Sequence, residues 1–174
     1  MKRVILHWTG GTYQPNSVDY EHYHYLITGD GLVVKGKYSP EDNENCNDGK
    51  YAQHTGGGNT GSIGIAYCGM YGYKNPDNVG NYPIKPVQLE LGLSLIPDIL
   101  QQYNIKNITP DTVMTHYEFG KKHPKTSSAG KIDITYLPPY SFVEKDDVGN
   151  FLRSKVRWYK KRLIINKSSS LGVP

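Results

Sequence analysis

The sequence predicts an α/β (α+β) fold in which helices flank a central mixed β-sheet. Three patterns support this class: apolar, β-branched runs that end at glycine-rich turns, two such runs joined by Gly-Asp-Gly, and segments with apolar residues every three to four positions. A sheet and amphipathic helices bury their apolar faces by packing on one another. At 174 residues, the chain is long enough to bury one core.

The N-terminal part predicts a strand, a short helix and a hairpin. Apolar residues before His7 predict a strand that ends at a Gly-Gly turn. Ser17 is expected to cap a short helix over residues 17–22. Residues 22–28 and 32–36 flank Gly-Asp-Gly and predict a hairpin. In its first strand, histidines alternate with tyrosines, a pattern that plain amphipathic packing also explains.

Two loops and a buried strand are predicted in the middle of the chain. Residues 37–50 are rich in Asn, Pro and Gly and predict an exposed loop with solvated acids. Residues 55–61 are glycine-rich, so a ligand could approach their backbone closely. They lack the lysine-serine ending of a phosphate-binding loop, which argues against nucleotide binding. Residues 62–68 predict a buried strand.

The second half predicts a loop, two helices and a strand. Residues 69–86 are expected to rim a cleft. Residues 87–103 have helical periodicity, and Pro97 predicts a kink or two helical pieces. The run 112–115 predicts a strand that delivers His116. Residues 148–165 predict a basic amphipathic helix, for which docking on the core outweighs contact with an anionic wall or membrane surface.

The chain is therefore divided into a main domain over residues 1–140 and a basic C-terminal helical extension over residues 141–174. The last residues, 167–174, are expected to be a frayed tail.

Composition excludes several classes of protein. A net charge of +4 and a pI near 8.9 suit an anionic polymer as partner but fall short of a nucleic-acid-binding signature. No stretch predicts a transmembrane span or a signal peptide. Cys46 and Cys68 could form at most one disulfide, and a chain of this size does not need it, so they do not indicate a redox compartment.

Two histidines and one aspartate suggest a metal site. His7 and His116 each stand where a predicted strand ends, and Asp133 lies on a nearby loop, two residues after Lys131. Such a set offers three ligands to zinc and leaves a fourth position open, as in catalytic rather than structural zinc sites. His123 is a competing ligand, although its basic surroundings favour a solvated loop residue.

An ordered series of short motifs resembles one family. The series comprises Ile-Leu-His7, Tyr23-His-Tyr-Leu-Ile, Gln53-His54, Asn59 with Ser62-Ile-Gly-Ile, Thr115-His116 and Lys131-Ile-Asp133. Together these residues resemble the zinc-dependent N-acetylmuramoyl-L-alanine amidases, a family that includes phage lysozyme-type endolysins and the peptidoglycan recognition proteins. The resemblance covers roughly residues 2–138 and implies a mixed sheet with Zn²⁺ in a peptidoglycan-binding groove.

The resemblance also implies roles for individual residues. His7, His116 and Asp133 match the zinc ligands, and Lys131 matches a lysine that stabilises the tetrahedral intermediate. Some members carry a glutamate where this chain has Ala66, whereas others use a tyrosine at the position of Tyr23.

Tyr23 is therefore expected to orient water or relay a proton. His54 and Asn59 are expected to line the substrate site. The segment between His116 and Lys131 is longer than is usual in the family, and Ile134-Thr replaces the Pro-Gly that often follows the aspartate.

The expected activity is hydrolysis of the amide between N-acetylmuramic acid and L-alanine. The resemblance and the absence of a predicted signal peptide suggest a phage or prophage endolysin, held in the host cytoplasm until lysis. The alternative is a peptidoglycan-binding module without hydrolysis, as in members that have lost a zinc ligand.

Overall fold

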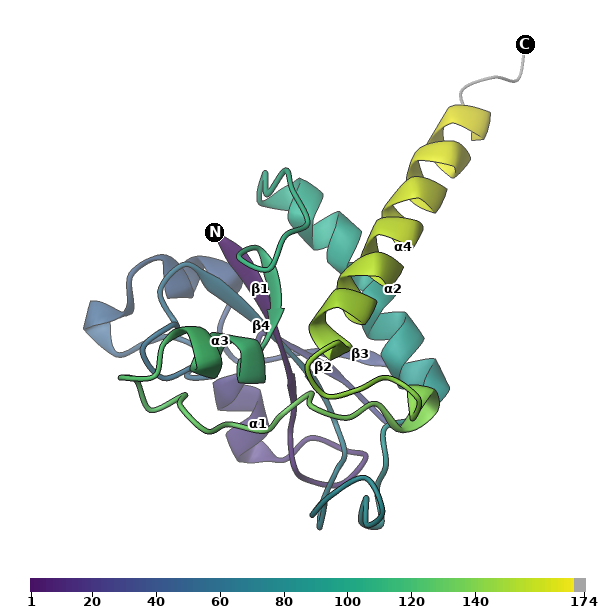
Figure 1. Ribbon diagram of the computed structural model, residues 1–174. Helices are drawn as coiled ribbons and strands as arrows, with labels where there is room; N and C mark the ends of the chain where they lie inside the picture. Colours follow the sequence, from purple (N-terminus) through teal and green to yellow (C-terminus); the bar gives the residue numbers. More distant parts are fainter. Residues whose placement is uncertain (171–174) are drawn as a thin grey trace.

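The computed structural model describes the backbone of residues 1–170 and the side chains of residues 1–165. Its centre is a five-stranded sheet with strand order β3-β2-β4-β1-β5 (Figure 1). The strands are β1 (Arg3–Trp8), β2 (Tyr25–Ile27), β3 (Val33–Lys35), β4 (Ser62–Tyr67) and β5 (Val113–Thr115). All neighbouring strands are parallel except β2 and β3, which form the antiparallel hairpin. The predicted mixed sheet is confirmed.

Four α-helices surround this sheet. They are α1 (Ser17–His22), α2 (Pro86–Gln102), α3 (His116–Lys122) and α4 (Val148–Ser170), and three 3-10 helices, η1 (Pro40–Glu44), η2 (Cys46–Asp48) and η3 (Pro138–Tyr140), lie in the connections. Helices α2 and α4 lie together on one side of the sheet, and α1 and α3 lie on the other (Figure 1).

The alternation of side chains along β1 separates the core from the functional face. Val4 and Leu6 join the main hydrophobic core with residues of α2 and α4, and both are fully buried. Ile5 points the other way and packs with Phe119 of α3. His7 shares the face of Ile5, so the strand carries it to the side opposite α2 and α4.

The short helix α1 forms where it was predicted, but its cap is Asn16 rather than Ser17. The Asn16 side chain accepts hydrogen bonds from Val18 N and Asp19 N, and Asp19 Oδ2 accepts one from Asn16 N at 2.9 Å. This reciprocal capping box satisfies backbone donors that the first turn leaves free. The helix ends before Tyr23, which therefore lies between α1 and β2 and not within a strand.

Most of the segment 37–50 is exposed, as expected, but it is not a plain loop. The helices η1 and η2 form there, and Asn43 is fully buried. Asn43 Nδ2 donates to Ala52 O and its Oδ1 accepts from Ala52 N, so this side chain ties the segment to the chain that enters the glycine-rich loop. Acids of the segment are also engaged: Glu41 accepts a hydrogen bond from the Tyr103 hydroxyl at 2.8 Å, and Asp42 accepts one from Ser39 N at 2.8 Å.

Helix α2 is one helix, not two pieces. It runs without interruption from Pro86 to Gln102 with Pro97 inside it. Leu89, Leu93 and Ile96 are all fully buried against the sheet, and their packing offsets the backbone hydrogen bond that Pro97 cannot donate.

Helix α4 belongs to the main core, as the docking interpretation predicted. Val148, Leu152 and Val156 are at most 1 % exposed, and they pack with residues of α2 and of the sheet. Both sides of the boundary predicted at residue 140 therefore contribute to a single hydrophobic core.

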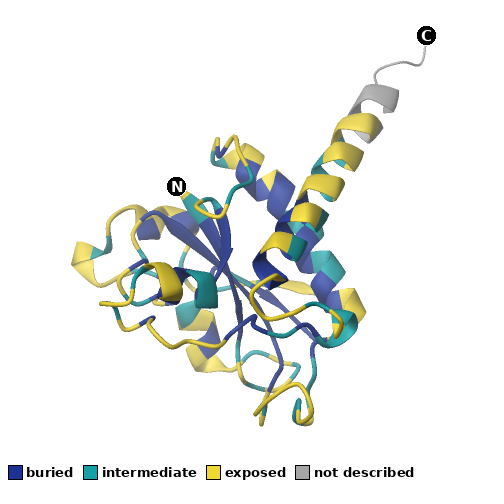
Figure 2. Ribbon diagram, in the orientation of Figure 1, coloured by how far each residue is buried: buried dark blue, intermediate teal, exposed yellow. Residues whose placement is uncertain are grey.

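The outer part of α4 extends away from this core and is exposed (Figure 2). The frayed tail was predicted to begin at Lys167, but the helix continues to Ser170; residues 171–174 lie outside the described part of the chain. Within residues 1–170, no helix has both the length and the apolar character of a membrane span.

Candidate metal centre

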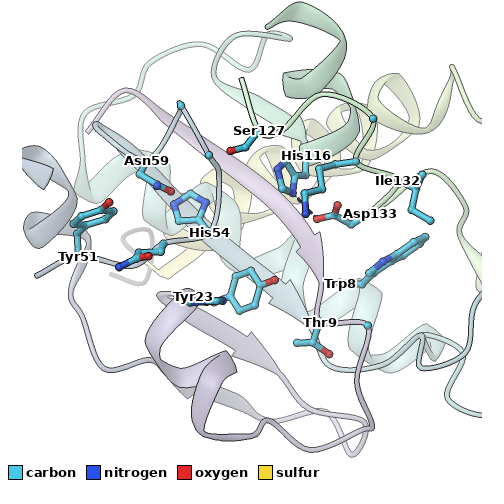
Figure 3. A pocket seen from close by; sticks show the side chains of 17 residues that line it. Trp8, Thr9, Tyr23, Tyr51, His54, Asn59, His116, Ser127, Ile132 and Asp133 are labelled. Atoms are coloured by element: carbon cyan, nitrogen blue, oxygen red, sulfur yellow. Dashed lines mark hydrogen bonds and ion pairs between the residues drawn. The ribbon is translucent and has the colours of Figure 1, made fainter. Parts of the chain in front are cut away.

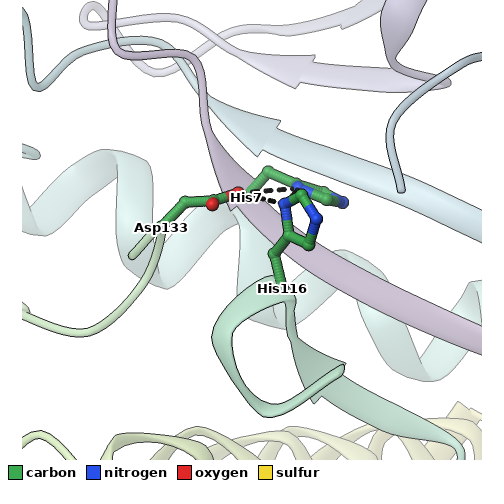
Figure 4. A group of neighbouring side chains, drawn as sticks. All are labelled: His7, His116 and Asp133. Carbon is green, nitrogen blue, oxygen red and sulfur yellow. Dashed lines mark hydrogen bonds and ion pairs between the residues drawn. The ribbon is translucent and has the colours of Figure 1, made fainter. Parts of the chain in front are cut away.

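The three predicted ligands meet at one point, although they come from three separate elements. His7 lies in β1, His116 is the first residue of α3, and Asp133 lies in the loop that follows α3. His7 Nδ1 is 3.1 Å from His116 Nδ1, and Asp133 Oδ2 is 2.9 Å from the first and 2.8 Å from the second (Figure 4). All three side chains are buried.

Ser128 fixes the proton on His116. The single hydroxyl proton of Ser128 is donated to Gly56 O at 2.8 Å, so its oxygen must accept the hydrogen bond from His116 Nε2 at 2.9 Å. His116 therefore carries a proton on Nε2 and turns Nδ1 toward Asp133. Ser128 is fully buried, and it is a site residue that the sequence analysis missed.

His54 contacts the outer nitrogen of His7. His54 Nε2 lies 3.3 Å from Ser62 O, a carbonyl that can only accept, so this nitrogen carries the proton. His54 Nδ1 then accepts, and two groups lie within its reach: Thr55 Oγ1 at 2.8 Å and His7 Nε2 at 3.2 Å, with Thr55 Oγ1 also 3.4 Å from His7 Nε2. His7 Nε2 is thus engaged on the side away from the cluster, and Nδ1 faces His116 and Asp133.

His54 lines the cavity, as expected. Its ring also contacts His7 Nε2, so it helps to orient His7, one of the three candidate metal-binding residues. Gly64 leaves room for the His54 ring because it has no side chain. A Cβ atom at this position would lie 2.6 Å from Cγ of His54.

Burial sets the charge state of the cluster. It lowers the pKa of His7 to about 4 against the opposing effect of Asp133, and it lowers the pKa of His54 well below the usual value. Burial alone would raise the pKa of Asp133, but hydrogen bonds with His116 and His7 outweigh it and lower that pKa. The site therefore holds neutral histidine beside an ionised carboxylate at neutral pH.

This arrangement fits a metal cation. With their Nε2 atoms engaged elsewhere, His7 and His116 both turn Nδ1 toward Asp133 Oδ2, so two imidazole nitrogens and a carboxylate oxygen converge on one point. Each of these three atoms has a lone pair that it can give to a cation lying among them. Ligating histidines normally donate their other ring nitrogen to a neighbouring group, as both do here. The cluster could thus hold a divalent metal ion.

The backbone at Asp133 is unusual. Ile134 has a φ of 60°, a left-handed conformation that β-branched residues rarely adopt, and it is fully buried. Thr135 N donates to Ile132 O at 3.1 Å, which closes a turn with Ile134 at its third position. This turn directs Asp133 toward the histidines. Glycine would normally signal such a turn, so the residue type at position 134 does not predict it.

A cavity of about 730 Å³ opens over the cluster (Figure 3). Its lining includes all the remaining predicted site residues, namely Tyr23, His54, Asn59 and Lys131. The ring of Tyr23 lies 5.2 Å from the ring of His7, and burial raises its pKa above the usual value. Tyr23 therefore keeps its proton at neutral pH and offers a hydrogen-bond donor to the cavity.

The other two histidines considered as functional lie outside the cluster. His24 donates from Nε2 to Asn43 Oδ1 at 3.0 Å and accepts from Gly64 N at 2.9 Å, so it supports the fold. His123, the competing ligand, packs its ring 4.3 Å from that of Phe119. The third member of the cluster is Asp133, not His123.

Comparison with solved structures found chains with related folds. LysC, an N-acetylmuramoyl-L-alanine amidase from Clostridium intestinale URNW, is 17 % identical over 66 % of this chain and 69 % of its own, with a TM-score of 0.44. The Drosophila peptidoglycan recognition protein SD is 18 % identical over 73 % and 74 %, with a TM-score of 0.47. A mutant of PlyL is 20 % identical over 90 % and 84 %, with a TM-score of 0.49.

No curated protein matches the chain. A family model does match it, over residues 1–131, which include His7 and His116 and end two residues before Asp133. Since the match spans 131 of 174 residues, the chain belongs to the N-acetylmuramoyl-L-alanine amidase family.

Proposed function

We propose that this protein is a zinc-dependent hydrolase that cuts the amide bond between N-acetylmuramic acid and L-alanine in peptidoglycan. The observation that carries the proposal is the convergence of three atoms able to bind a metal, His7 Nδ1, His116 Nδ1 and Asp133 Oδ2, at the floor of an open cavity. A binding module needs a groove but has no use for such a cluster.

The donor set suits zinc. Two imidazoles and one carboxylate, with a fourth position facing a cavity, form a common catalytic zinc site. The three side-chain atoms that would hold the ion lie 2.8–3.1 Å from one another, so a single ion could contact all of them. Bound zinc supplies a Lewis acid, which can lower the pKa of water to about 7 and polarise an amide carbonyl.

Residues of the chain supply the rest of the chemistry. Lys131 lines the cavity beside Asp133, and its positive charge can offset the oxyanion that develops as the amide is attacked. Tyr23 stays protonated because burial raises its pKa, so it serves as a hydrogen-bond donor that orients water or the oxyanion, and not as a general base. Ser128 and His54 hold the ligand rings in orientation.

The runner-up function is peptidoglycan binding without hydrolysis. The family includes recognition proteins, and the cavity alone would serve either role. Retention of the complete His-His-Asp cluster, with Lys131 and Tyr23 beside it, favours the enzyme.

The decisive experiment measures metal content and hydrolysis on the same preparation. Purified protein should contain about one zinc ion per chain, release new N-terminal alanine from bacterial cell walls, and lose that activity in a chelator until zinc is restored. A zinc-loaded protein that binds walls but releases no amino groups would support the recognition module instead.

We further propose that the enzyme acts as a phage or prophage endolysin, kept in the host cytoplasm until lysis. The exposed basic end of α4 would then be available for weak contact with an anionic wall or membrane surface. Expression inside a bacterium, with and without a membrane-permeabilising protein, tests this role: lysis should require permeabilisation.

A further inference from the structure

Positive charge is gathered at the C-terminal end of the chain. Residues 148–174 contain seven Lys or Arg residues and no acid, whereas residues 1–147 contain 13 Lys or Arg residues and 16 Asp or Glu residues. The first 147 residues therefore carry a formal charge of −3 and the remainder a charge of +7, which together give the net charge of +4. This segregation indicates an anionic partner for the C-terminal region and not for the rest of the molecule.

Most of the cations of α4 are not neutralised by the protein itself. The first two pair with acids, Arg153 with Glu118 and Lys155 with Glu90. The next four form no salt bridge with any residue whose side chain is described: Arg157, Lys160, Lys161 and Arg162. Two of these four donate to backbone carbonyls, which leaves their charge uncompensated.

One side of α4 combines such cations with large apolar residues. Positions 151, 155, 158, 162 and 165 are separated by four, three, four and three residues, a spacing that places them in one row along a helix. The row, called here the α4 stripe, consists of Phe151, Lys155, Trp158, Arg162 and Ile165. The fully buried residues of α4, such as Leu152 and Val156, belong to a different side of the helix, so the core does not cover the stripe.

The apolar members of the α4 stripe are exposed, as is a phenylalanine at its base. Trp158 is 48 % exposed and Ile165 is 61 % exposed. Phe142 is 76 % exposed, and its ring lies 6.2 Å from the ring of Phe151. The guanidinium of Arg162 lies 4.2 Å from the centre of the Trp158 ring. Large apolar side chains gathered on a surface indicate contact with another molecule.

An anionic lipid bilayer is the partner that suits both features of this surface. Its phosphate groups attract Lys and Arg, and the boundary between its headgroups and acyl chains accepts tryptophan and aliphatic side chains. A soluble or wall-bound polyanion would satisfy the cations but would give the exposed apolar side chains no apolar surroundings. A second copy of the chain would bring two sets of uncompensated positive charges together, and their repulsion opposes such a dimer.

We propose that the α4 stripe, together with Phe142, docks on the surface of an anionic lipid bilayer. Helix α4 lies on the side of the sheet opposite the cavity over the metal centre, so the docked protein keeps this cavity uncovered and directed away from the lipid (Figure 1). The docking surface shares no residue with the lining of that cavity. The inference rests on the proposed function only for the reason why the protein meets a bilayer.

Co-sedimentation of the full chain with lipid vesicles tests the proposal. One set of vesicles contains phosphatidylcholine with about a quarter phosphatidylglycerol, and the other contains phosphatidylcholine alone. The protein should bind the zwitterionic vesicles at least about 100-fold more weakly than the anionic ones, because each cation near an anionic surface adds to the affinity. Raising the salt from about 0.1 M to about 1 M should weaken binding by more than about tenfold, because it shortens the Debye length from about 10 Å to about 3 Å.

Trp158 reports on insertion into the bilayer. The chain has two tryptophans, and the other one, Trp8, is only 7 % exposed. Binding should therefore shift the tryptophan emission to shorter wavelength, and lipids with brominated acyl chains should quench it. Neither change should occur in Trp158→Ser.

Variants at exposed positions measure the contribution of charge. Lys161→Gln combined with Arg162→Gln should weaken binding to the anionic vesicles about 25-fold, which is about fivefold for each charge. Lys50→Gln combined with Lys74→Gln is the matched control, since both lysines are exposed and lie outside α4. The control should change the affinity by less than about twofold, although it removes the same number of charges.

A second pair of variants measures the contribution of apolar contact. Phe142→Ser should weaken binding about tenfold, because an exposed aromatic ring no longer leaves water when the protein docks. Val18→Ser is the control, since Val18 of α1 is 56 % exposed and lies on the other side of the sheet, and it should leave the affinity unchanged.

Three results would overturn the proposal. Equal binding to both kinds of vesicle would show that anionic lipid is not recognised. Binding to soluble polyphosphate as tight as to vesicles, and unaffected by Phe142→Ser, would assign the cations to a soluble polyanion. Self-association in analytical ultracentrifugation that Trp158→Ser abolishes, without vesicle binding, would assign the stripe to a second copy. A protein that binds vesicles as expected but releases no amino groups from walls would refute only the proposed function.

Discussion

Removing the guanidinium of Arg153 should loosen the metal centre from a distance. Arg153 of α4 is buried, and it donates to both carboxylate oxygens of Glu118 at 2.9 and 3.0 Å and to Val113 O at 3.0 Å. Glu118 Oε2 accepts from Thr115 N at 3.0 Å and so completes the capping box that starts α3. The first residue of that helix is the ligand His116.

The magnitude follows from what Arg153→Met leaves behind. Methionine keeps most of the packing but leaves one ionised carboxylate and one strand carbonyl without their partner. Loss of one member of a buried ion pair costs about 3–5 kcal/mol. The Glu118 side chain is 23 % exposed, so water can replace part of the interaction, and we expect the free energy of unfolding to fall by about 3 kcal/mol.

The assay is urea unfolding of the metal-free protein, followed by zinc affinity from competition with a chelator. Arg157→Met is the matched control, because Arg157 is one turn further along α4 and exposed, and it donates only to Ile108 O. The control should lose less than about 1 kcal/mol. Zinc should bind roughly tenfold more weakly to Arg153→Met, since the helix start that holds His116 is no longer fixed.

A difference between the two variants of less than about 1 kcal/mol would refute this reasoning, because it would show that the buried pair adds nothing beyond an exposed arginine. A large loss of stability with unchanged zinc affinity would confirm the pair but refute its connection to His116.

Four further outcomes follow from the site. His7→Ala should remove both bound zinc and wall hydrolysis, measured by metal analysis and amine release. Lys131→Ala should keep zinc and lower kcat/KM about 100- to 1,000-fold, whereas Asp133→Ala should lose zinc; the reverse pattern would reassign the third ligand. Gly64→Ala should weaken zinc binding, because the new Cβ would lie 2.6 Å from the ring that orients His7. Burial lowers the pKa of His24 from 6.5 to about 4, so its contribution to stability is complete above pH 6.5 and falls as the pH drops toward 4. Between pH 7 and pH 5 this loss should be about 2 kcal/mol, and it should be absent from urea titrations of His24→Asn.

Much of the fold could be predicted from local pattern. The hairpin and the central strand have dense β-branched sequences with glycine at their ends, and both form where expected. The segment 37–50 was misjudged because its composition is that of a loop, and only the burial of Asn43 organises it. The continuity of α2 through Pro97 was equally hidden, since it depends on tertiary packing against the sheet.

The three residues of the candidate metal centre could be proposed from the sequence, whereas the residues that orient them could not. His7 and His116 stand at strand ends, a position visible in the sequence, and the structure brings them together with Asp133. Ser128 carries no such signal, because a serine in a polar loop is ordinary until the fold places it against His116 Nε2. The left-handed Ile134 was hidden for a similar reason, since its residue type argues against the conformation that it adopts.

The pairing of Arg153 with Glu118 has a consequence for the order in which the protein is made. His7 is synthesised well before Arg153, which steadies the start of the helix that carries His116 and lies 146 positions further along the chain. Strand β1 also lies between β4 and β5, so its hydrogen bonds wait for residues that are synthesised much later. A chain that has been synthesised only as far as Asp133 therefore contains all three residues of the cluster but lacks the arginine that holds the start of α3 in place, so the site is completed only after Arg153 has joined the fold.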